Sequence, residues 1–319
     1  MSQRSPAMRR LSVEGTRLLL DGQFFYWQGL SFFNALYNPT FNASADARSH
    51  WLRVFDDNGI NALRVWCQWE FEPPRDFVDT DPAHTMYTPE GEIRTASFAR
   101  LEALLEAVRP IGMVVEIVLF SHEKEPNLPV PAQERAVRVM AQRLLPHRDL
   151  LLQIWNEDST QVARYFDAIK SIDPDRLVTN SPGFASDLGD PAQNRMLDLL
   201  TPHTARGDAD RFWEVAAQQV AALLTEYGKP VIDDEPARTG TIQFGGISGG
   251  TEPWQHIAQI EAMRAVGGYH TYHHDMFQYA YGAPSTPPNG LPDPDYSRFH
   301  REVFDYLRDH RVWELEPEE

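Results

Sequence analysis

Carboxylates follow two short apolar runs of the sequence directly. Glu157 comes after Asn156 at the end of the run 150–155, and three consecutive acids, 233–235, end a second run that begins at Val231. Two carboxyl groups that face one another can divide a reaction between a general acid and a nucleophile or base. The sequence therefore offers a candidate catalytic pair, provided that the fold brings these two runs together.

Further polar or aromatic side chains stand at the ends of other apolar runs. We expect the following residues to bind a ligand or to support the acids: Asn34, Arg64, Trp66, His122, Asn156, His203, His270 and Tyr272. An arginine in an apolar strand needs a desolvated partner, and inward carboxylates are the candidates. His122 and His203 could equally be core histidines whose hydrogen bonds are satisfied within the protein.

These residues must be positioned by eight apolar runs that alternate with stretches of helical periodicity. Such alternation indicates repeated βα units and a parallel sheet. Only the connection 183–196 lacks a convincing helix. The runs are Tyr26–Phe32, Ala62–Trp66, Met113–Phe120, Leu150–Trp155, Leu177–Asn180, Leu197–Thr201, Val231–Asp234 and Gly268–Tyr272.

Eight such units predict an α/β fold, a (β/α)₈ TIM barrel, with a doubly wound open sheet as the alternative. The phosphate-binding patterns G-x-G-x-x-G after the first run and G-x-x-x-x-G-K-[ST] are both absent, which favours the barrel. A short N-terminal β-hairpin is expected from the run 13–20, the turn pair Asp21-Gly22 and the aromatic run 23–27. We expect one domain over 1–319, with residues 1–25 as a hairpin cap.

In a barrel the carboxyl ends of the strands form the site, so acids after the fourth and seventh strands face each other across its mouth. This arrangement suits glycoside hydrolysis, which uses two carboxyl groups about 5–5.5 Å apart for retention and about 6.5–9.5 Å apart for inversion. Alternation along the seventh strand predicts that Asp233 shares the side of Glu235 and that Asp234 points toward the helices.

The chain resembles a clan A glycoside hydrolase and is most similar to the family 5 cellulase and mannanase type. The residues that carry the likeness are Trp27-Gln28-Gly29, Asn61-Ala62-Leu63-Arg64-Val65-Trp66, Ile154-Trp155-Asn156-Glu157, and Lys229-Pro230-Val231 with Glu235. The resemblance covers nearly the whole barrel. It implies that Glu157 is the acid/base and Glu235 the nucleophile.

Two departures from the family pattern concern the sugar site. Family members usually have a Tyr two residues after the histidine of the sixth strand, whereas His203 is followed by Thr204 and Ala205. The Trp platform of the eighth strand is replaced by Tyr269, Tyr272 and histidines. These changes leave the identity of the sugar open.

The sequence thus predicts a retaining β-glycosidase that hydrolyses β-linked, gluco- or manno-type oligo- or polysaccharides without a cofactor or metal. One alternative is a catalytically silent barrel that binds carbohydrate. Another is a metal-dependent hydrolase or isomerase, suggested by His270, His273 and His274. The stretch SFFNALY after the first strand lacks the H-x-H pair that such an enzyme would typically use.

Composition limits the partners. Among 319 residues, 29 Lys plus Arg against 46 Asp plus Glu give a net charge of −17, which makes nucleic acid an unexpected partner. No apolar run reaches the ~18 residues of a membrane span, and the single Cys67 excludes an intramolecular disulfide. The basic start MSQRSPAMRR is followed by no apolar h-region. We therefore expect a cytoplasmic protein, or a secreted one if a leader precedes this sequence.

Overall fold

The structure, a computed structural model, describes residues 9–68, 83–121, 128–206, 210–236, 251–274, 277 and 290–311. Its N-terminal part is a small antiparallel sheet of β1 (Leu11–Glu14), β2 (Arg17–Leu20) and β3 (Gln23–Phe24). The run 13–20, expected as one strand, is interrupted by a turn at Gly15, whose φ is 56°. Asp21 and Gly22 also have positive φ and join β2 to β3, because a tight turn of this kind matches the twist of the two strands.

The main sheet has seven parallel strands in the order β8-β7-β6-β5-β4-β10-β9. Each coincides with an apolar run in the sequence, and their continuous burial explains why those runs do not alternate with polar residues. The strands are β4 (Gln28–Ser31), β5 (Ala62–Trp66), β6 (Val114–Ser121), β7 (Leu150–Asn156), β8 (Leu177–Thr179), β9 (Ile232–Asp233) and β10 (Tyr269–Tyr272).

The remaining expected strand, 197–201, is not a strand of this sheet. It nevertheless bonds to both edges: the Asp198 N–H donates to the Val178 carbonyl at 3.1 Å, and the Ile232 N–H donates to the Leu200 carbonyl at 2.9 Å. The segment therefore lies between β8 and β9, the two edge strands of the curled sheet, but its pairing is too sparse for a regular strand.

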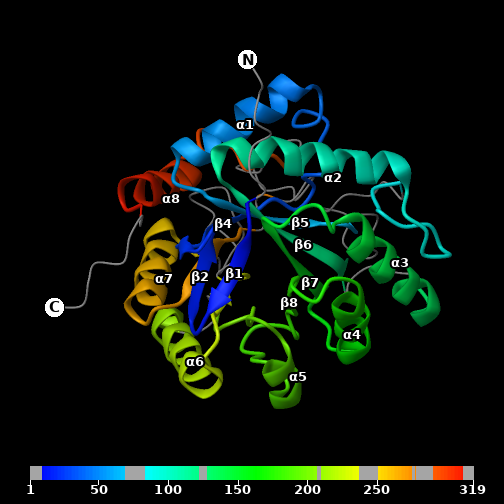
Figure 1. Ribbon diagram of the computed structural model, residues 1–319. Helices are drawn as coiled ribbons and strands as arrows, with labels where there is room; N and C mark the ends of the chain where they lie inside the picture. Colours follow the sequence, from blue (N-terminus) through cyan, green and yellow to red (C-terminus); the bar gives the residue numbers. More distant parts are fainter. Residues whose placement is uncertain are drawn as a thin grey trace.

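Helices surround the sheet in a ring (Figure 1). They are α1 (Ala45–Asp57), α2 (Thr95–Val108), α3 (Val130–Arg143), α4 (Val162–Ile172), α5 (Pro191–Met196), α6 (Phe212–Tyr227), α7 (Pro253–Ala265) and α8 (Arg298–Asp309), with a 3₁₀ turn, η1 (Arg109–Ile111), after α2. Helix α5 lies in the connection 183–196, where no convincing helix was predicted. At six residues it is too short to show a period, and it begins where the Asp190 carboxylate accepts hydrogen bonds from two backbone N–H groups.

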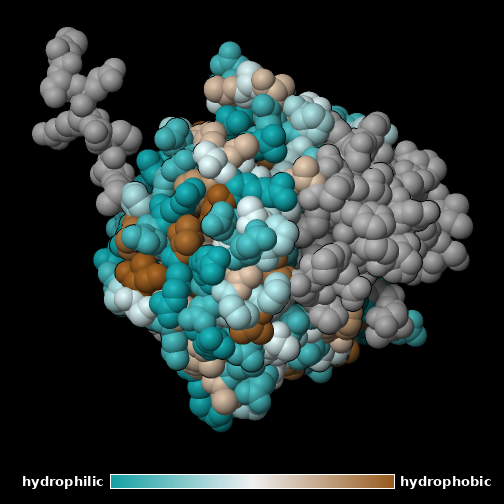
Figure 2. All heavy atoms as spheres, turned by 90° about the vertical axis from the view of Figure 1, so that its right-hand side faces the viewer, coloured by the Kyte–Doolittle hydropathy of each residue, from teal (hydrophilic) through white to brown (hydrophobic). Residues whose placement is uncertain are grey.

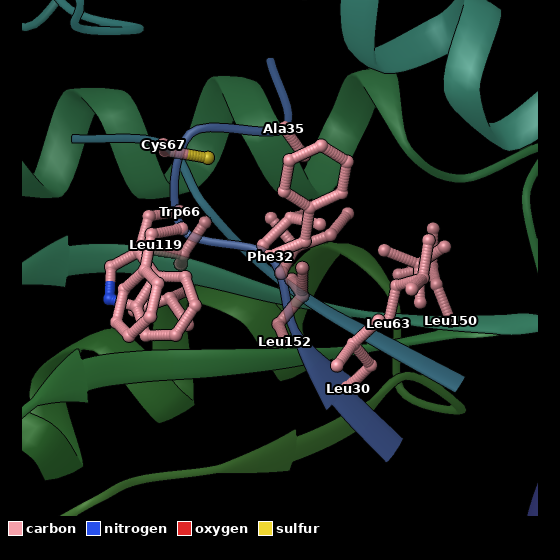
Figure 3. Packing of buried hydrophobic residues seen from close by; sticks show 14 of the residues in the cluster. Leu30, Phe32, Ala35, Leu63, Trp66, Cys67, Leu119, Leu150 and Leu152 are labelled. Carbon is pink, nitrogen blue, oxygen red and sulfur yellow. The ribbon is translucent and has the colours of Figure 1, made fainter. Parts of the chain in front are cut away.

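Two apolar cores hold these layers together. The larger lies between the sheet and the helices, and Figure 3 shows part of it around Phe32, Leu63 and Leu152. The smaller fills the amino-terminal end of the curled sheet, where Leu18 of β2 joins side chains of the parallel strands. The Leu18 N–H also donates to the Tyr269 hydroxyl at 2.9 Å. The N-terminal sheet therefore covers the amino ends of the strands and leaves their carboxyl ends for a site.

The outer surface is predominantly polar on the face shown in Figure 2, where hydrophobic residues form separate small patches. Among the described helices, none combines the length and the apolar character needed to cross a membrane.

The contribution of the N-terminal sheet can be measured at Leu18, whose side chain is fully buried. We expect Leu18→Ala to lower the free energy of unfolding by about 2–5 kcal/mol, because it removes apolar contacts and leaves a cavity. Urea denaturation measures the change. Val215→Ala, at a residue on α6 that is 40% exposed, is the control and should change stability by less than about 0.5 kcal/mol. Equal effects of the two substitutions would mean that β2 is not part of the core.

Candidate active site

Arg64 of β5 occupies the centre of the site, fully buried. Its Nε donates to Gln153 Oε1 at 3.0 Å, and Nη2 donates to Asn156 Oδ1 at 2.6 Å and lies 3.0 Å from Asp234 Oδ2. Nη1 donates to the Asp234 carbonyl at 3.3 Å and to Glu235 Oε2 at 3.2 Å. A guanidinium has five N–H donors. Five oxygen atoms therefore surround the guanidinium, four as hydrogen-bond acceptors and Asp234 Oδ2 as an ion-pair partner. Asn156, which was expected as a supporting residue, helps to hold this cation.

Charge and stacking keep Arg64 ionised and in place. Burial alone would lower the pKa of Arg64, but the carboxylates of Asp234 and Glu235 raise it above its ordinary value. Trp66 lies against the guanidinium, with Arg64 Cζ 4.5 Å from the ring centre, and Phe33 stacks on the same indole at 4.7 Å. Trp66 is thus a supporting residue that contacts Arg64.

The two candidate catalytic acids lie side by side. One carboxylate oxygen of Glu157, one of Glu235 and one ring nitrogen of His203 all lie within 4.8 Å of one another. Both carboxylates are buried. Glu157 follows the last residue of β7 and has a φ of 62°, in the left-handed region. The backbone therefore turns at Glu157, where the extended strand ends, and the side chain joins that of Glu235.

His203 lies between the acids. Its Nδ1 is 3.2 Å from Glu157 Oε1, and its Nε2 is 3.6 Å from Glu235 Oε2. Burial lowers the pKa of His203 to about 4, against the smaller opposing effects of Glu235 and Asp234. The imidazole is therefore neutral at neutral pH. The structure thus places this predicted residue in the site.

Arg206 is a site residue that the sequence reasoning missed. Its Nη2 contacts Glu235 Oε1 at 2.8 Å, His203 Nδ1 at 3.0 Å and Glu157 Oε1 at 3.3 Å, while Nε donates to the Glu235 carbonyl at 3.2 Å. Because a guanidinium can only donate, the ring hydrogen of neutral His203 must reside on Nε2. The sequence signal that could have indicated Arg206 was the departure from the family pattern just after His203, where Thr204 and Ala205 stand in place of the usual Tyr.

The expected orientation of two acids in the seventh run was wrong. Asp234 faces Arg64 and accepts from Ser181 Oγ at 2.7 Å. Asp233 faces the helices, where Gln259 Nε2 of α7 donates to it at 2.6 Å. Burial raises the pKa of Asp233 to about 7, although the hydrogen bonds of Thr204 and Gln259 lower it in part. Strand β9 ends at Asp233, so the alternation assumed for the following residues does not extend to Glu235.

Two predicted residues of β10 do not belong to the site. The Tyr272 ring packs edge-on against His256 of α7 at 5.6 Å and Phe304 of α8 at 5.4 Å. His270, two residues earlier, is on the same face of the strand, and burial lowers its pKa well below the usual value, with smaller effects from His256 and Arg264 of α7. Both side chains therefore point toward the helices, and the expectation that they bind substrate was wrong.

The residue that follows β10 on the inner face is His273. Its Nε2 lies 3.8 Å from Glu235 Oε1, and its Nδ1 forms a 2.9 Å hydrogen bond with Ser31 Oγ of β4. The sequence suggested His273 only as a metal ligand. A shift of one residue along the strand separates it from Tyr272 and places it on the opposite face.

Asn34 and His122 are the remaining residues that were predicted for the site. Asn34 is buried in the turn after β4, where its carbonyl accepts from the N–H groups of Tyr37 and Asn38. Its expected role beside the two acids stays a prediction. His122 lies outside the described residues.

Glu116 of β6 is a second residue that the sequence reasoning missed. It pairs in register with Arg64 and is fully buried, and neither carboxyl oxygen has a hydrogen-bond partner among the described residues. Burial first, and then the neighbouring Asp234, raise the pKa of Glu116 to about 8, against the opposing effect of Arg64. Glu116 is therefore protonated at neutral pH, and it adds no negative charge to those already around Arg64.

Solved structures of several glycoside hydrolases are similar to this chain. No protein-family model matches the chain, and no curated protein matches it. A glycoside hydrolase family 5 structure from Bacteroides vulgatus matches with a TM-score of 0.66 at 17% identity, over 91% of this chain and 69% of that one. An endo-1,4-β-mannanase from Rhizomucor miehei matches with a TM-score of 0.63 at 13% identity, over 94% and 98%.

The fold of the chain is similar to the folds of these glycoside hydrolases. A GH2 β-galacturonidase from Eisenbergiella tayi also matches, with a TM-score of 0.65 at 17% identity, over 96% of this chain. The chain spans 55% of the length of that protein and the same share of another Bacteroides vulgatus structure. The resemblance to family 5 glycoside hydrolases is thereby confirmed at the level of the fold.

Glu116 makes stability depend on pH in a testable way. Because its folded pKa of about 8 exceeds its ordinary value of 4.5, Glu116 stabilises the fold fully below pH 4.5, and this stabilisation is lost as the pH rises toward 8. We expect the stability of Glu116→Gln relative to the wild type to rise across this window by up to about 1.4 kcal/mol per pH unit. Denaturation at pH 5, 6, 7 and 8 measures this difference. Glu102→Gln, on the exposed face of α2, should run parallel to the wild type, and a parallel Glu116→Gln curve would contradict the assignment.

Proposed function

We propose that the protein is a retaining β-glycosidase, with Glu235 as nucleophile and Glu157 as acid/base. The observation that carries the proposal is the approach of these two carboxylates to within 4.8 Å in a chain with the glycoside hydrolase fold. Such proximity suits direct attack by one carboxylate, since inverting enzymes separate the pair by about 6.5–9.5 Å to admit a water molecule. Both residues were expected in these roles from the sequence.

The reaction follows from the positions of the two acids. Glu235 attacks the anomeric carbon, the bond from that carbon to the leaving oxygen breaks, and Glu157 gives its proton to that oxygen. Water then attacks the glycosyl-enzyme, passes a proton to Glu157 and releases Glu235 as a carboxylate. Arg64 holds Glu235 Oε2 at 3.2 Å throughout, so the nucleophile is fixed before substrate arrives. These steps use no cofactor or metal.

The architecture that supports this chemistry is one catalytic domain over the whole chain. We infer that the segment 197–201 closes the curled sheet into an eight-stranded barrel, because it bonds to β8 on one side and to β9 on the other. Its ligand is a β-linked carbohydrate. The structural neighbours are named for mannan and galacturonide, so gluco- or manno-type substrates are one class within the proposal.

Arg206 favours one alternative and opposes another. A guanidinium that contacts both carboxylates is compatible with a silent carbohydrate-binding barrel, in which the acids serve only as hydrogen-bond acceptors. A metal ion bound by Glu157, His203 and Glu235 would have to displace Arg206 Nη2, which contacts all three. The site therefore offers a cation position that an arginine already fills.

The catalytic pair is tested with aryl β-glycosides. We expect Glu157→Gln to lower kcat/KM by about 10²–10⁴-fold for substrates with poor leaving groups, because proton transfer contributes about that much. Glu235→Ala should lose nearly all turnover and regain part of it with azide, which yields the inverted product. Product anomers followed by NMR distinguish retention from inversion.

The control is Glu102→Ala, which removes an exposed carboxylate on α2 and should keep wild-type turnover. Undiminished turnover in Glu235→Ala would overturn the assignment of the nucleophile. Wild-type protein that binds sugars but cleaves no aryl β-glycoside would favour the silent barrel.

A further inference from the structure

The proposed mechanism gives Arg206 no task, although it contacts both acids. It lies three residues beyond His203, and its side chain is only 8% exposed. Its Nη2 lies within 3.3 Å of an oxygen of each catalytic acid. Since a glycoside must bring its anomeric carbon to Glu235 and its leaving oxygen to Glu157, substrate and Arg206 compete for the same two carboxylates.

The two arginines of the site differ in the donors that they can offer to a ligand. All three guanidinium nitrogens of Arg64 donate hydrogen bonds within the protein, and Nη2 also forms an ion pair with Asp234. Arg206 uses Nε and Nη2, whereas its Nη1 has no hydrogen bond among the described residues. Of the two arginines described in the site, Arg206 is therefore the one whose Nη1 keeps two N–H donors for a ligand.

A substrate that moves Arg206 away from the acids must replace what the guanidinium loses. An uncompensated buried charge costs several kcal/mol, and breaking a buried ion pair is strongly destabilising. A neutral sugar offers hydroxyl groups, which accept single hydrogen bonds. A carboxylate offers two oxygens in the planar geometry that a guanidinium matches, together with the opposite charge.

We propose that Arg206 is a specificity-determining residue that selects β-glycosides whose sugar carries a carboxylate, that is, β-uronides. The inference rests on the proposed glycosidase function. The uronate carboxylate pairs with Arg206 and draws it away from Glu157 Oε1, which frees that oxygen to hydrogen-bond the leaving group. The same movement of Arg206 then both binds the uronate carboxylate and exposes Glu157.

The test compares substrates that differ only at C6: aryl β-glucuronide with aryl β-glucoside, and aryl β-galacturonide with aryl β-galactoside. We expect wild-type kcat/KM for at least one uronide to exceed that of its neutral partner by tenfold or more. Arg206→Gln should lower the uronide-to-neutral ratio by about 10–100-fold, the range for a hydrogen bond to a charged group. Arg206→Lys should restore part of it, because the charge returns without the planar fork.

Arg164→Gln, which removes an exposed arginine from α4, is the matched control and should leave the ratio unchanged. A wild type that prefers neutral glycosides, or a ratio that Arg206→Gln does not alter, would overturn the inference while leaving the glycosidase proposal intact. If no glycoside is cleaved, the proposed function fails. Thermal stabilisation of the wild type then decides: stronger stabilisation by glucuronate or galacturonate than by glucose or galactose supports the role of Arg206, and equal stabilisation overturns it. If Arg206→Gln does not fold, Arg206→Lys and the wild-type ratio give the answer.

Discussion

The guanidinium of Arg64 is a full charge with no access to water, and such a charge persists in a folded protein only when its donors are all satisfied. The five acceptors come from β7 and from the end of β9. Removing any one of them would leave a buried N–H without a partner. Arg64 of β5 thus fixes the orientation of Glu235, which follows β9. The position of Glu235 therefore depends on how the strands of the sheet are packed.

Arg64 and its polar partners form a single layer of charged and hydrogen-bonded side chains inside the curled sheet. Below it, Leu18 and the amino ends of the strands form an apolar plug. Within it, burial is the largest cause of the shifted pKa values of Glu116, Asp234 and His203. Dry packing beneath the site and close pairing within it thus act together: the first removes water, and the second determines which groups remain charged.

Sequence alone predicted the alternation of strands and helices, because apolar periodicity is a local property of the chain. It also identified Arg64, since an arginine in an apolar run requires a buried partner. It could not assign the faces of Asp234 or Tyr272, because a change of one residue in where a strand ends reverses which side chains point inward. Arg206 follows the segment 197–201, which was predicted as a strand but pairs too sparsely to be one, so no strand register indicated where its side chain points. Glu116 lies within an apolar run as Arg64 does, and the same argument would have identified it.

The backbone at Glu157 has a consequence beyond its position. A left-handed φ of 62° is unfavourable for most residues with a Cβ, and glycine or asparagine tolerates it better than glutamate does. Replacing Glu157 with glycine or asparagine would therefore relieve the unfavourable backbone conformation, but it would remove the proposed acid/base. In the proposed function the reaction requires a carboxylate at this turn, where folding would favour another residue, so that stability and activity oppose each other at a single position.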